Sequence, residues 1–230
     1  MELERSDNAM PIHVEADEVI SATGFVCPLR DLPSIGVATF GQSKLPAQTD
    51  FWESASVPGI FFAGTIGQGA AGLKKHGIPA NSGAVQGSRY NARLLVQEIA
   101  ERHFRIVPER KPIALADLRD HLLAEATYAP ELWHQKAYLA SVVSLDPDTG
   151  VRDEGIMPLT RFLDGGGADA VAMTVESDGA TIYPVVYVRR DGKIEEHALE
   201  ADPLNDFEGL PYKRALGTIL DRLTAGASAA

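Results

Sequence analysis

The stretch PGIFFAG, residues 58–64, decides how the first half of this sequence is interpreted. Its four central residues are apolar and stand between glycines, a pattern typical of a strand buried on both faces. A glycine-rich turn follows, and Asn81 or Ser82 can cap a helix that we expect to extend through Glu101. The apolar stripe of this helix would consist of Val85, Ala92, Leu95 and Ile99.

Upstream of this stretch, apolar and polar alternation predicts two further strands, over residues 12–16 and 18–23, with Gly24 ending the second. Between them and residue 58, residues 27–57 contain prolines and glycines too often for long regular elements. The first half therefore has the pattern of an α/β module.

The second half combines helices with strands. Two helices are predicted from apolar residues at helical spacing, one containing Leu115, Leu118 and Leu122 and the other containing Leu216, Ile219, Leu220 and Leu223. Enrichment in Val, Ile and Tyr predicts strands over residues 137–145, 170–176, 182–190 and 193–199. Asp191 and Gly192 form a strong two-residue hairpin signal, and Pro184 predicts that its strand lies at a sheet edge.

We expect two modules, residues 1–104 and 105–230. The border is predicted near residues 106–112, where two prolines bracket a charged stretch after the first long helix. The first module carries 11 acidic and 8 basic residues and the second carries 21 and 13. The predicted fold is thus α/β, with a small acidic α+β domain and an antiparallel sheet in the second module.

Composition and charge exclude several classes of protein. The 230 residues are 45% hydrophobic and 23% charged, as in an ordinary folded domain. A net charge of −11 repels phosphate backbones and anionic lipid, so nucleic acid and membrane surfaces are not expected partners. The polar start does not match a signal peptide, and no apolar run approaches the ~20 residues that span a bilayer. The single cysteine, Cys27, is interpreted as a small buried hydrophobe, and we expect a cytoplasmic location.

No metal site is predicted. The six histidines show neither HxH nor HExxH spacing. The stretch DPDTG, residues 146–150, resembles the opening of a calcium loop, but Met157 stands where a bidentate glutamate is required. We interpret this stretch as a turn between strands.

The stretch GQGAAG, residues 67–72, matches the GxGxxG pattern of dinucleotide-binding loops, but its context does not. A glycine and a proline interrupt the segment where a helix should follow, and residues 85–97 contain no acid for a ribose. The glycines still let backbone approach a ligand, towards which the helix near Ser82 would direct its positive end. Gly83 and Gly87, four residues apart, would leave room for a flat group. The alternative is a flexible loop and a helix packed tightly on a sheet.

Two motifs in this order resemble the closing portion of the FAD domain in the pyridine-nucleotide oxidoreductase flavoproteins. They are DEVISATGF at residues 17–25, which places Gly24 in the family's ATG motif, and PGIFFAG at residues 58–64. The resemblance covers residues 14–101. It implies a partial FAD/NAD(P)-binding, Rossmann-like fold for residues 1–104, since the family's pyrophosphate-binding and NAD(P)-binding motifs lie upstream of this portion.

The resemblance also implies cofactor-binding residues. In the family, a Gly-Asp at the end of the second motif bonds the ribityl chain of the flavin, and the next helix points its amino end at the flavin ring. Carried over by position, Gly64, Thr65 and Ile66 would line the ribityl side, with the Thr65 hydroxyl in place of the carboxylate. Ser82 and Gly83 would lie near the ring, and the resemblance implies Gly24, in the ATG turn beside the junction of the FAD and NAD(P) domains, as a further cofactor-binding residue.

His76 lies in the glycine-rich turn, where it would face the edge of a flavin or nicotinamide; the alternative is a solvated loop histidine. The resemblance implies part of a flavin-dependent oxidoreductase that moves hydride from NAD(P)H through FAD to an acceptor, with few catalytic protein groups because the flavin carries the chemistry. Alone, the chain is expected to be inactive and to retain no flavin. Its expected partner is a complementing FAD/NAD(P)-binding polypeptide or a second copy. The alternative is a non-catalytic interaction module that docks through open apolar edges.

Overall fold

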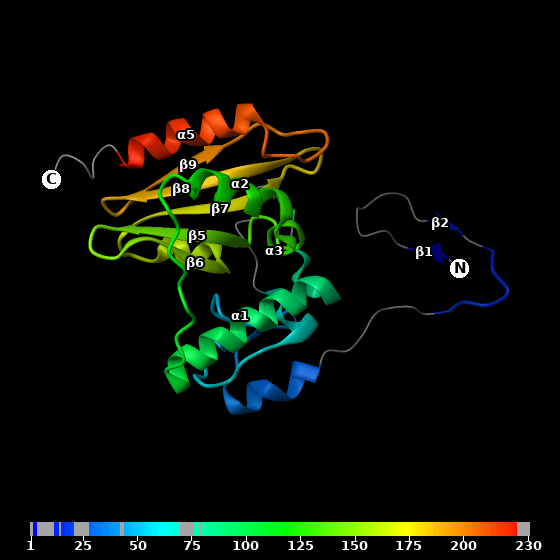
Figure 1. The fold of residues 1–230 in the computed structure, drawn as a ribbon. Coiled ribbons are helices and arrows are strands. Elements are labelled where there is room, and N and C mark those ends of the chain that lie inside the picture. The colour runs from blue at the N-terminus through cyan, green and yellow to red at the C-terminus, as the bar shows by residue number, and fades with distance from the viewer. Residues whose placement is uncertain are drawn as a thin grey trace.

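A five-stranded antiparallel sheet forms the centre of the fold (Figure 1). The computed structural model describes residues 2–3, 12–13, 15–20, 28–41, 44–69, 76–78 and 80–224. The sheet has the order β6-β5-β7-β8-β9. Its strands are β5 (Leu139–Asp146), β6 (Gly150–Pro158), β7 (Asp169–Ser177), β8 (Ile182–Arg190) and β9 (Lys193–Ala198). The chain is therefore a mixed α/β protein, with a sheet unlike the parallel sheet of a Rossmann-like fold.

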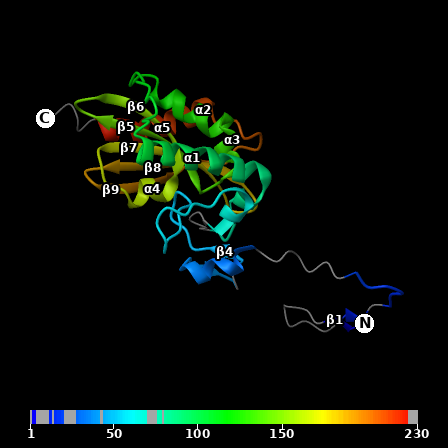
Figure 2. The ribbon, with the colours of Figure 1, turned by 90° about the horizontal axis from the view of Figure 1, so that it is seen from below.

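Side chains that alternate along the strands give the sheet two apolar faces. One face, which includes Val143 and Val186, belongs to the larger core. The helices that contribute to this core are α1 (Val85–Phe104), α2 (Leu118–Tyr128), α3 (Pro130–His134) and α5 (Leu210–Thr224). The opposite face, with Val142 and Tyr187, packs against the short helix α4 (Leu159–Asp164). Figure 2 shows α4 on the side of the sheet away from α5.

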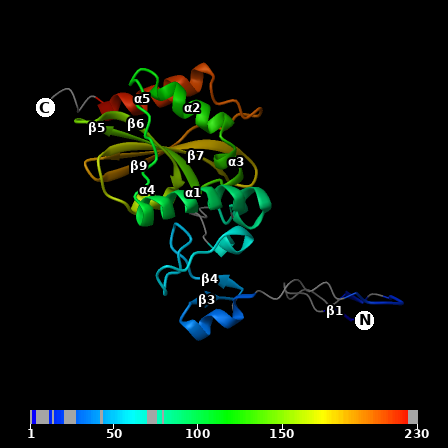
Figure 3. The same ribbon diagram turned by 60° about the horizontal axis from the view of Figure 1, so that its bottom comes forward.

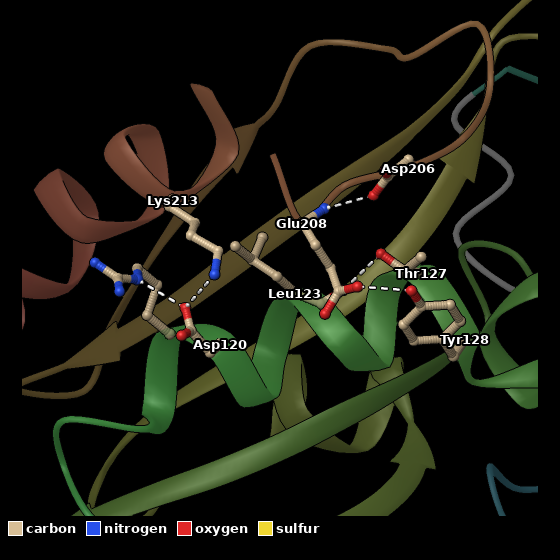
Figure 4. Close-up of polar contacts among 8 residues, drawn as sticks. Asp120, Leu123, Thr127, Tyr128, Asp206, Glu208 and Lys213 are labelled. Carbon is tan, nitrogen blue, oxygen red and sulfur yellow. Dashed lines mark hydrogen bonds and ion pairs between the residues drawn. The ribbon is translucent and has the colours of Figure 1, made fainter. Parts of the chain in front are cut away.

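Helices α2 and α5 pack against each other through side chains such as Leu122 and Leu216, both fully removed from solvent. Polar contacts link the outer surfaces of these segments (Figure 4). Lys213 Nζ lies 3.4 Å from Asp120 Oδ1, and the Tyr128 hydroxyl donates to Glu208 Oε2 at 2.6 Å. Such exposed pairs contribute about 0–1 kcal/mol each, so apolar packing dominates the attachment of α5.

The strands predicted at residues 137–145, 170–176, 182–190 and 193–199 correspond to β5, β7, β8 and β9. Asp191 and Gly192 have positive φ values of 50° and 74°, as the predicted hairpin turn requires. The DPDTG stretch forms the turn between β5 and β6, as predicted. The enrichment in Val, Ile and Tyr did not predict β6, because this edge strand carries polar residues. Its pairing with β5 also shifts register between Val142 and Val143, as at a β-bulge.

The prediction that Pro184 marks a sheet edge is wrong, because β8 lies between β7 and β9. On the β9 side the pairing ends with Val185 opposite Ala198. Pro184 therefore lies just outside the residues of β8 that pair with β9. Because proline has no N–H, this position lets β8 be an inner strand without losing a hydrogen bond to β9.

The buried strand predicted at residues 58–64 is wrong. Phe61 makes only an isolated bridge with Glu53, and the amide of Phe62 donates to the carbonyl of Trp52 at 2.8 Å. Within the described residues this segment has no second strand neighbour. Phe62 is buried while Ala63 is exposed, so the apolar run is covered on one side only.

The strands predicted at residues 12–16 and 18–23 are also largely wrong. Strand β2 (Ile12–His13) pairs with β1 (Glu2–Leu3), and residues 18–20 lie in no strand. Residues 21–27, with Gly24 and Cys27, lie outside the described residues. The irregular character predicted for residues 27–57 is matched by short elements: the 3-10 helix η1 (Pro28–Ile35) and strands β3 (Thr39–Phe40) and β4 (Leu45–Pro46).

Helix α1 confirms the predicted long helix and part of its predicted apolar stripe, since Leu95 is buried and Ile99 packs against the larger core. Val85 is 76% exposed, whereas the buried side contains Tyr90, Asn91 and Leu94. The predicted caps Asn81 and Ser82 instead form a separate 3-10 turn, and Ala84 is the N-cap. The pattern did not predict that Gly87 and Asn91 are also buried, because small and polar residues give no apolar signal.

Helix α1 lies beside the β6 edge of the sheet (Figure 1), and one of its ends lies near α3 (Figure 3). After α1, the chain pairs with this edge: Asp153 N donates to Lys111 O at 2.9 Å, and Ile113 N donates to Val151 O at 3.0 Å. Apolar packing also continues across the predicted border, since Tyr90 shares the larger core with the sheet. The division at residue 104 itself stays a prediction. No helix in the described part of the chain is long and apolar enough to cross a membrane.

Two glycine substitutions should change stability in opposite directions. Gly192→Ala places a Cβ at a φ of 74° and should lower the free energy of unfolding by about 1 kcal/mol. In Gly217→Ala, within α5, the added Cβ would meet no atom within 4 Å. Because alanine favours a helix more than glycine does, this variant should raise the free energy of unfolding by about 0.5–1 kcal/mol. Urea unfolding at one temperature measures both. Equal effects of the two variants would contradict the turn and helix assignments.

Candidate functional site

Three segments that the sequence places around the glycine-rich turn meet at the start of α1. They are the 3-10 helix η2 (Gly64–Gly69), the 3-10 turn η3 (Asn81–Gly83) and the first turns of α1, and each contacts the other two. We call these segments, residues 64–69 and 81–88, the glycine corner. The corner contains every predicted cofactor-binding residue except Gly24, which lies outside the described residues.

Gly64 and Thr65 are exposed residues of the glycine corner. Gly64 has a φ of 82°, a conformation that favours glycine, and a Cβ added there would meet nothing within 4 Å. The Thr65 side chain is exposed. Ile66 is half-buried and packs against the small cluster of Leu29, Val37 and Phe62. Gly64 and Thr65 thus face open space, whereas Ile66 anchors the segment.

The side chain of Ser82 points into the protein, towards the buried side-chain amide of Gln135 at the end of helix α3. Its hydroxyl donates to Gln135 Oε1 at 3.2 Å, and both residues are buried. Gln135 Nε2 in turn donates to the carbonyl of Gly87 at 3.0 Å and to Asn91 Oδ1 at 2.5 Å. The Ser82 side chain is therefore engaged within the protein, and the network holds η3 and α1 in place.

Gly83 and Gly87 do not share a helix face as predicted, because Gly83 belongs to η3 rather than to α1. A Cβ on Gly87 would lie 2.0 Å from the carbonyl oxygen of Asn81. Gly87 thus lets the start of α1 lie directly against the backbone of η3. This is tight backbone packing, the alternative to a space for a flat ligand. Gly83 is half-buried beside this contact.

The inner side of η2 rests on Trp52. A Cβ on Gly67 would lie 3.2 Å from Trp52 Cδ1, and Gln48 Nε2 donates to the Gly67 carbonyl at 2.9 Å. Trp52 is 1% exposed and contacts Tyr138 edge to face, with ring centroids 6.2 Å apart. Trp52 therefore connects the glycine corner to the core beside the sheet.

A carboxylate fixes the segment before the corner to α1. Glu53 Oε1 accepts the amide of Gly59 at 2.8 Å, and Glu53 Oε2 accepts from Arg102 Nη1 at 2.6 Å. The Gly59 amide, followed by the Arg102 guanidinium, holds the pKa of Glu53 below its ordinary value. Glu53 is nearly buried, so it is held as a charged, fully bonded group.

His76 contacts the sheet. Its Nε2 lies 2.9 Å from the hydroxyl of Tyr183 in β8, and its side chain is exposed. A Cβ on Gly179, in the β7–β8 turn, would lie 3.3 Å from Ile78 Cδ1. The described end of the glycine-rich turn, residues 76–78, is thus placed against the β7–β8 hairpin.

The first turn of α1 is open to a polar or negatively charged group. Its N-cap, Ala84, makes no side-chain cap bond, and the turn contains no acidic residue. Helix amides without internal partners carry partial positive charge. Among the described residues, no three His, Cys, Asp or Glu side chains lie close enough to hold a metal ion. The corner therefore offers backbone amides and the Thr65 hydroxyl rather than acid–base groups.

Several residues that build this corner carried no signal in the sequence. Gln135, Trp52 and the Glu53–Arg102 pair come from segments distant in the chain, and no spacing rule links them. Comparison of the chain with protein-family models, with curated proteins and with solved structures finds no match.

Glu53→Gln should make the free energy of unfolding depend less on pH in the acidic range. Because the pKa of Glu53 is lower in the folded protein, its stabilisation is fully present above its ordinary value of 4.5 and is lost as pH falls through the lowered pKa. The free energy of unfolding should fall more steeply from about pH 5 to about pH 3 in the unchanged protein than in the variant. At neutral pH the variant should lose about 1–2 kcal/mol.

Glu109→Gln is the matched control, since Glu109 is exposed and makes no ion pair in the described chain. Urea unfolding across this pH range should give Glu109→Gln the slope of the unchanged protein. If Glu53→Gln gives that same slope, the Gly59–Glu53–Arg102 contact does not hold the corner as described.

Proposed function

We propose that the glycine corner is the flavin-facing part of an FAD-dependent NAD(P)H oxidoreductase. The observation that carries this proposal is the assembly of η2, η3 and the uncapped start of α1 into one surface with Gly64 and Thr65 exposed. The motif resemblance requires these segments to lie together, although they are separated in the chain by the glycine-rich turn.

The residues of the corner fit a flavin unequally. Gly64 presents bare backbone and Thr65 presents a hydroxyl, both groups that can bond the hydroxyls of a ribityl chain. The amides at the start of α1 suit the polar edge of the flavin ring. Ile66 and Ser82 use their side chains within the protein, so in this proposal they position the corner and contribute only backbone groups.

FAD bound there would supply the hydride chemistry, with NAD(P)H as the donor. The protein's part is to orient the ring and to bond the ribityl chain. The FAD pyrophosphate would be held by residues outside the glycine corner, on a complementing FAD/NAD(P)-binding polypeptide or in a second copy. The chain alone is then expected to bind flavin too weakly to remain coloured after purification.

A specific observation favours the alternative, a module that docks to a partner protein. Large apolar side chains of the first half are exposed, including Ile35 at 58%, Phe40 at 61% and Phe104 at 68%. Exposed apolar surface marks contact sites. The same surface also suits a complementing polypeptide of a flavoprotein, so flavin binding is the property that separates the two proposals.

Titration of the purified chain with FAD, followed by amide NMR, tests the proposal. We expect FAD to shift the amide signals of Gly64, Thr65 and Gly83, with half-saturation near 1 mM, on the order of a weak small-ligand contact. ADP, which lacks the flavin and the ribityl chain, should shift them much less. Equal shifts with ADP, or no shifts at all, would contradict the proposal and favour the docking module.

Thr65→Val is the matching substitution. It preserves shape and removes the hydroxyl, and it should weaken FAD binding about five- to tenfold if that hydroxyl bonds the ribityl chain. Thr218→Val alters an exposed threonine of α5 that lies far along the chain and should leave FAD binding unchanged. Identical affinities for both variants would exclude Thr65 from the flavin contact.

A further inference from the structure

A cavity of about 550 Å³ lies on the face of the sheet opposite α2 and α5. Its floor includes Val142 of β5 and Ala170 of β7, and Phe162 of α4 forms part of its wall. Small residues such as Ala168 and Gly166 leave this part of the face uncovered by α4. The volume is within the range of small-molecule sites, about 300–1,000 Å³.

The cavity carries a surplus of positive charge. Its charged lining residues are four arginines and two carboxylates, namely Arg110, Arg152, Arg161, Arg189, Asp146 and Glu154. The chain as a whole has a net charge of −11. A local excess of arginine on such an acidic protein concentrates anions at this place. We call it the arginine cavity.

Both carboxylates already have partners. Glu154 accepts the Ser144 hydroxyl at 2.6 Å through Oε1, and its Oε2 lies 2.8 Å from Arg110 Nε. Asp146 Oδ1 accepts the amides of Thr149 and Asp148 at 2.9 and 2.8 Å, which hold the pKa of Asp146 below its ordinary value. Both acids are therefore engaged within the protein, and among the arginines of the cavity Arg110 is the one that makes a direct ion pair with a described residue.

Arg189 is fixed in the wall as a charge bonded to neutral groups. It donates to the carbonyls of Phe162, Gly165 and Ala168 at 3.0–3.1 Å, and its guanidinium lies 4.7 Å from the Phe162 ring centroid. Burial lowers the pKa of Arg189, as expected for a charge partly removed from water. The carbonyls orient this charge without cancelling it, and the charge of Asp169 nearby offsets part of the positive potential that Arg189 adds to the cavity.

Arg152 and Arg161 are the arginines with free donors. Arg152 donates Nε to the carbonyl of Thr149 at 3.2 Å, and no carboxylate lies within ion-pair distance of it in the described chain. The side chain of Arg161, on α4, makes no hydrogen bond or ion pair within the described residues, and the residue is exposed. A planar guanidinium with unused donors matches the two oxygens of a carboxylate or phosphate.

We propose that the arginine cavity binds a small organic anion with a carboxylate or phosphate head and an apolar body. Arg152 and Arg161 contact the head, and Val142, Met157 and Phe162 contact the body. This combination follows the usual design of a ligand site, in which an apolar lining gives affinity and few charged groups give orientation. The site lies in residues 110–189, apart from the glycine corner.

Calorimetric titration of the full chain at low ionic strength tests this site. The probes are phenyl phosphate, phenylacetate and the neutral 2-phenylethanol. We expect at least one anion to bind with a dissociation constant of about 1 mM or below, while the neutral probe does not bind. Tighter binding of phenyl phosphate assigns a phosphate head, and tighter binding of phenylacetate assigns a carboxylate head. Binding of neither anion, or equal binding of 2-phenylethanol, would overturn the proposal.

Arg161→Gln should weaken binding of the anion about tenfold, since one charge-assisted contact is removed from an exposed side chain on which no internal bond depends. Arg214→Gln is the matched control, an exposed arginine on α5 behind the sheet. Its affinity should equal that of the unchanged protein. Equal weakening by both variants would show that the anion responds to overall charge rather than to this cavity.

Discussion

Gln135, buried at the end of α3, bonds three groups that lie about fifty residues earlier in the chain. Its amide accepts from Ser82 and donates to the carbonyl of Gly87 and to Asn91. A buried amide left without partners costs about 1–3 kcal/mol, so these bonds permit a single placement of η3 and α1. Tyr90 and Leu94 of α1 pack in the larger core beside this network, and their burial also holds α1 against the sheet. The placement of the glycine corner on the rest of the protein depends on this contact.

The two faces of the five-stranded sheet are covered differently and carry different proposed sites. The side that packs on α1, α2, α3 and α5 contains the larger core, and the glycine corner is attached to it through Gln135 and Trp52. In the described part of the chain the other side is covered by α4 and is contacted by His76 at Tyr183, and an uncovered part forms the arginine cavity. The two proposed sites are therefore supported by one sheet, so that a ligand at either site would contact a rigid element.

The second half of the fold could be predicted because its signals are local. Strand β8 matches its predicted range, and the Asp191-Gly192 turn follows from backbone preference alone. The segment around Phe61 could not be predicted in this way, because the two strand neighbours that a buried strand requires are not present in the described chain. For the site, the role predicted for Thr65 stays a prediction, whereas the bond from Ser82 to Gln135 depends on a tertiary contact that no spacing encodes. The arginine cavity likewise gathers residues from four strands and a helix.

Native-state hydrogen exchange along α1 tests most directly whether the corner is fixed to the sheet. If Gln135 and the common core hold α1, the amides of Leu94 and Leu95 should open with the same free energy as those of Val171 and Met173 in β7. In Gln135→Leu the α1 amides alone should open more easily. An unchanged protein in which α1 opens at a much lower free energy while β7 stays protected would contradict a corner fixed to the sheet.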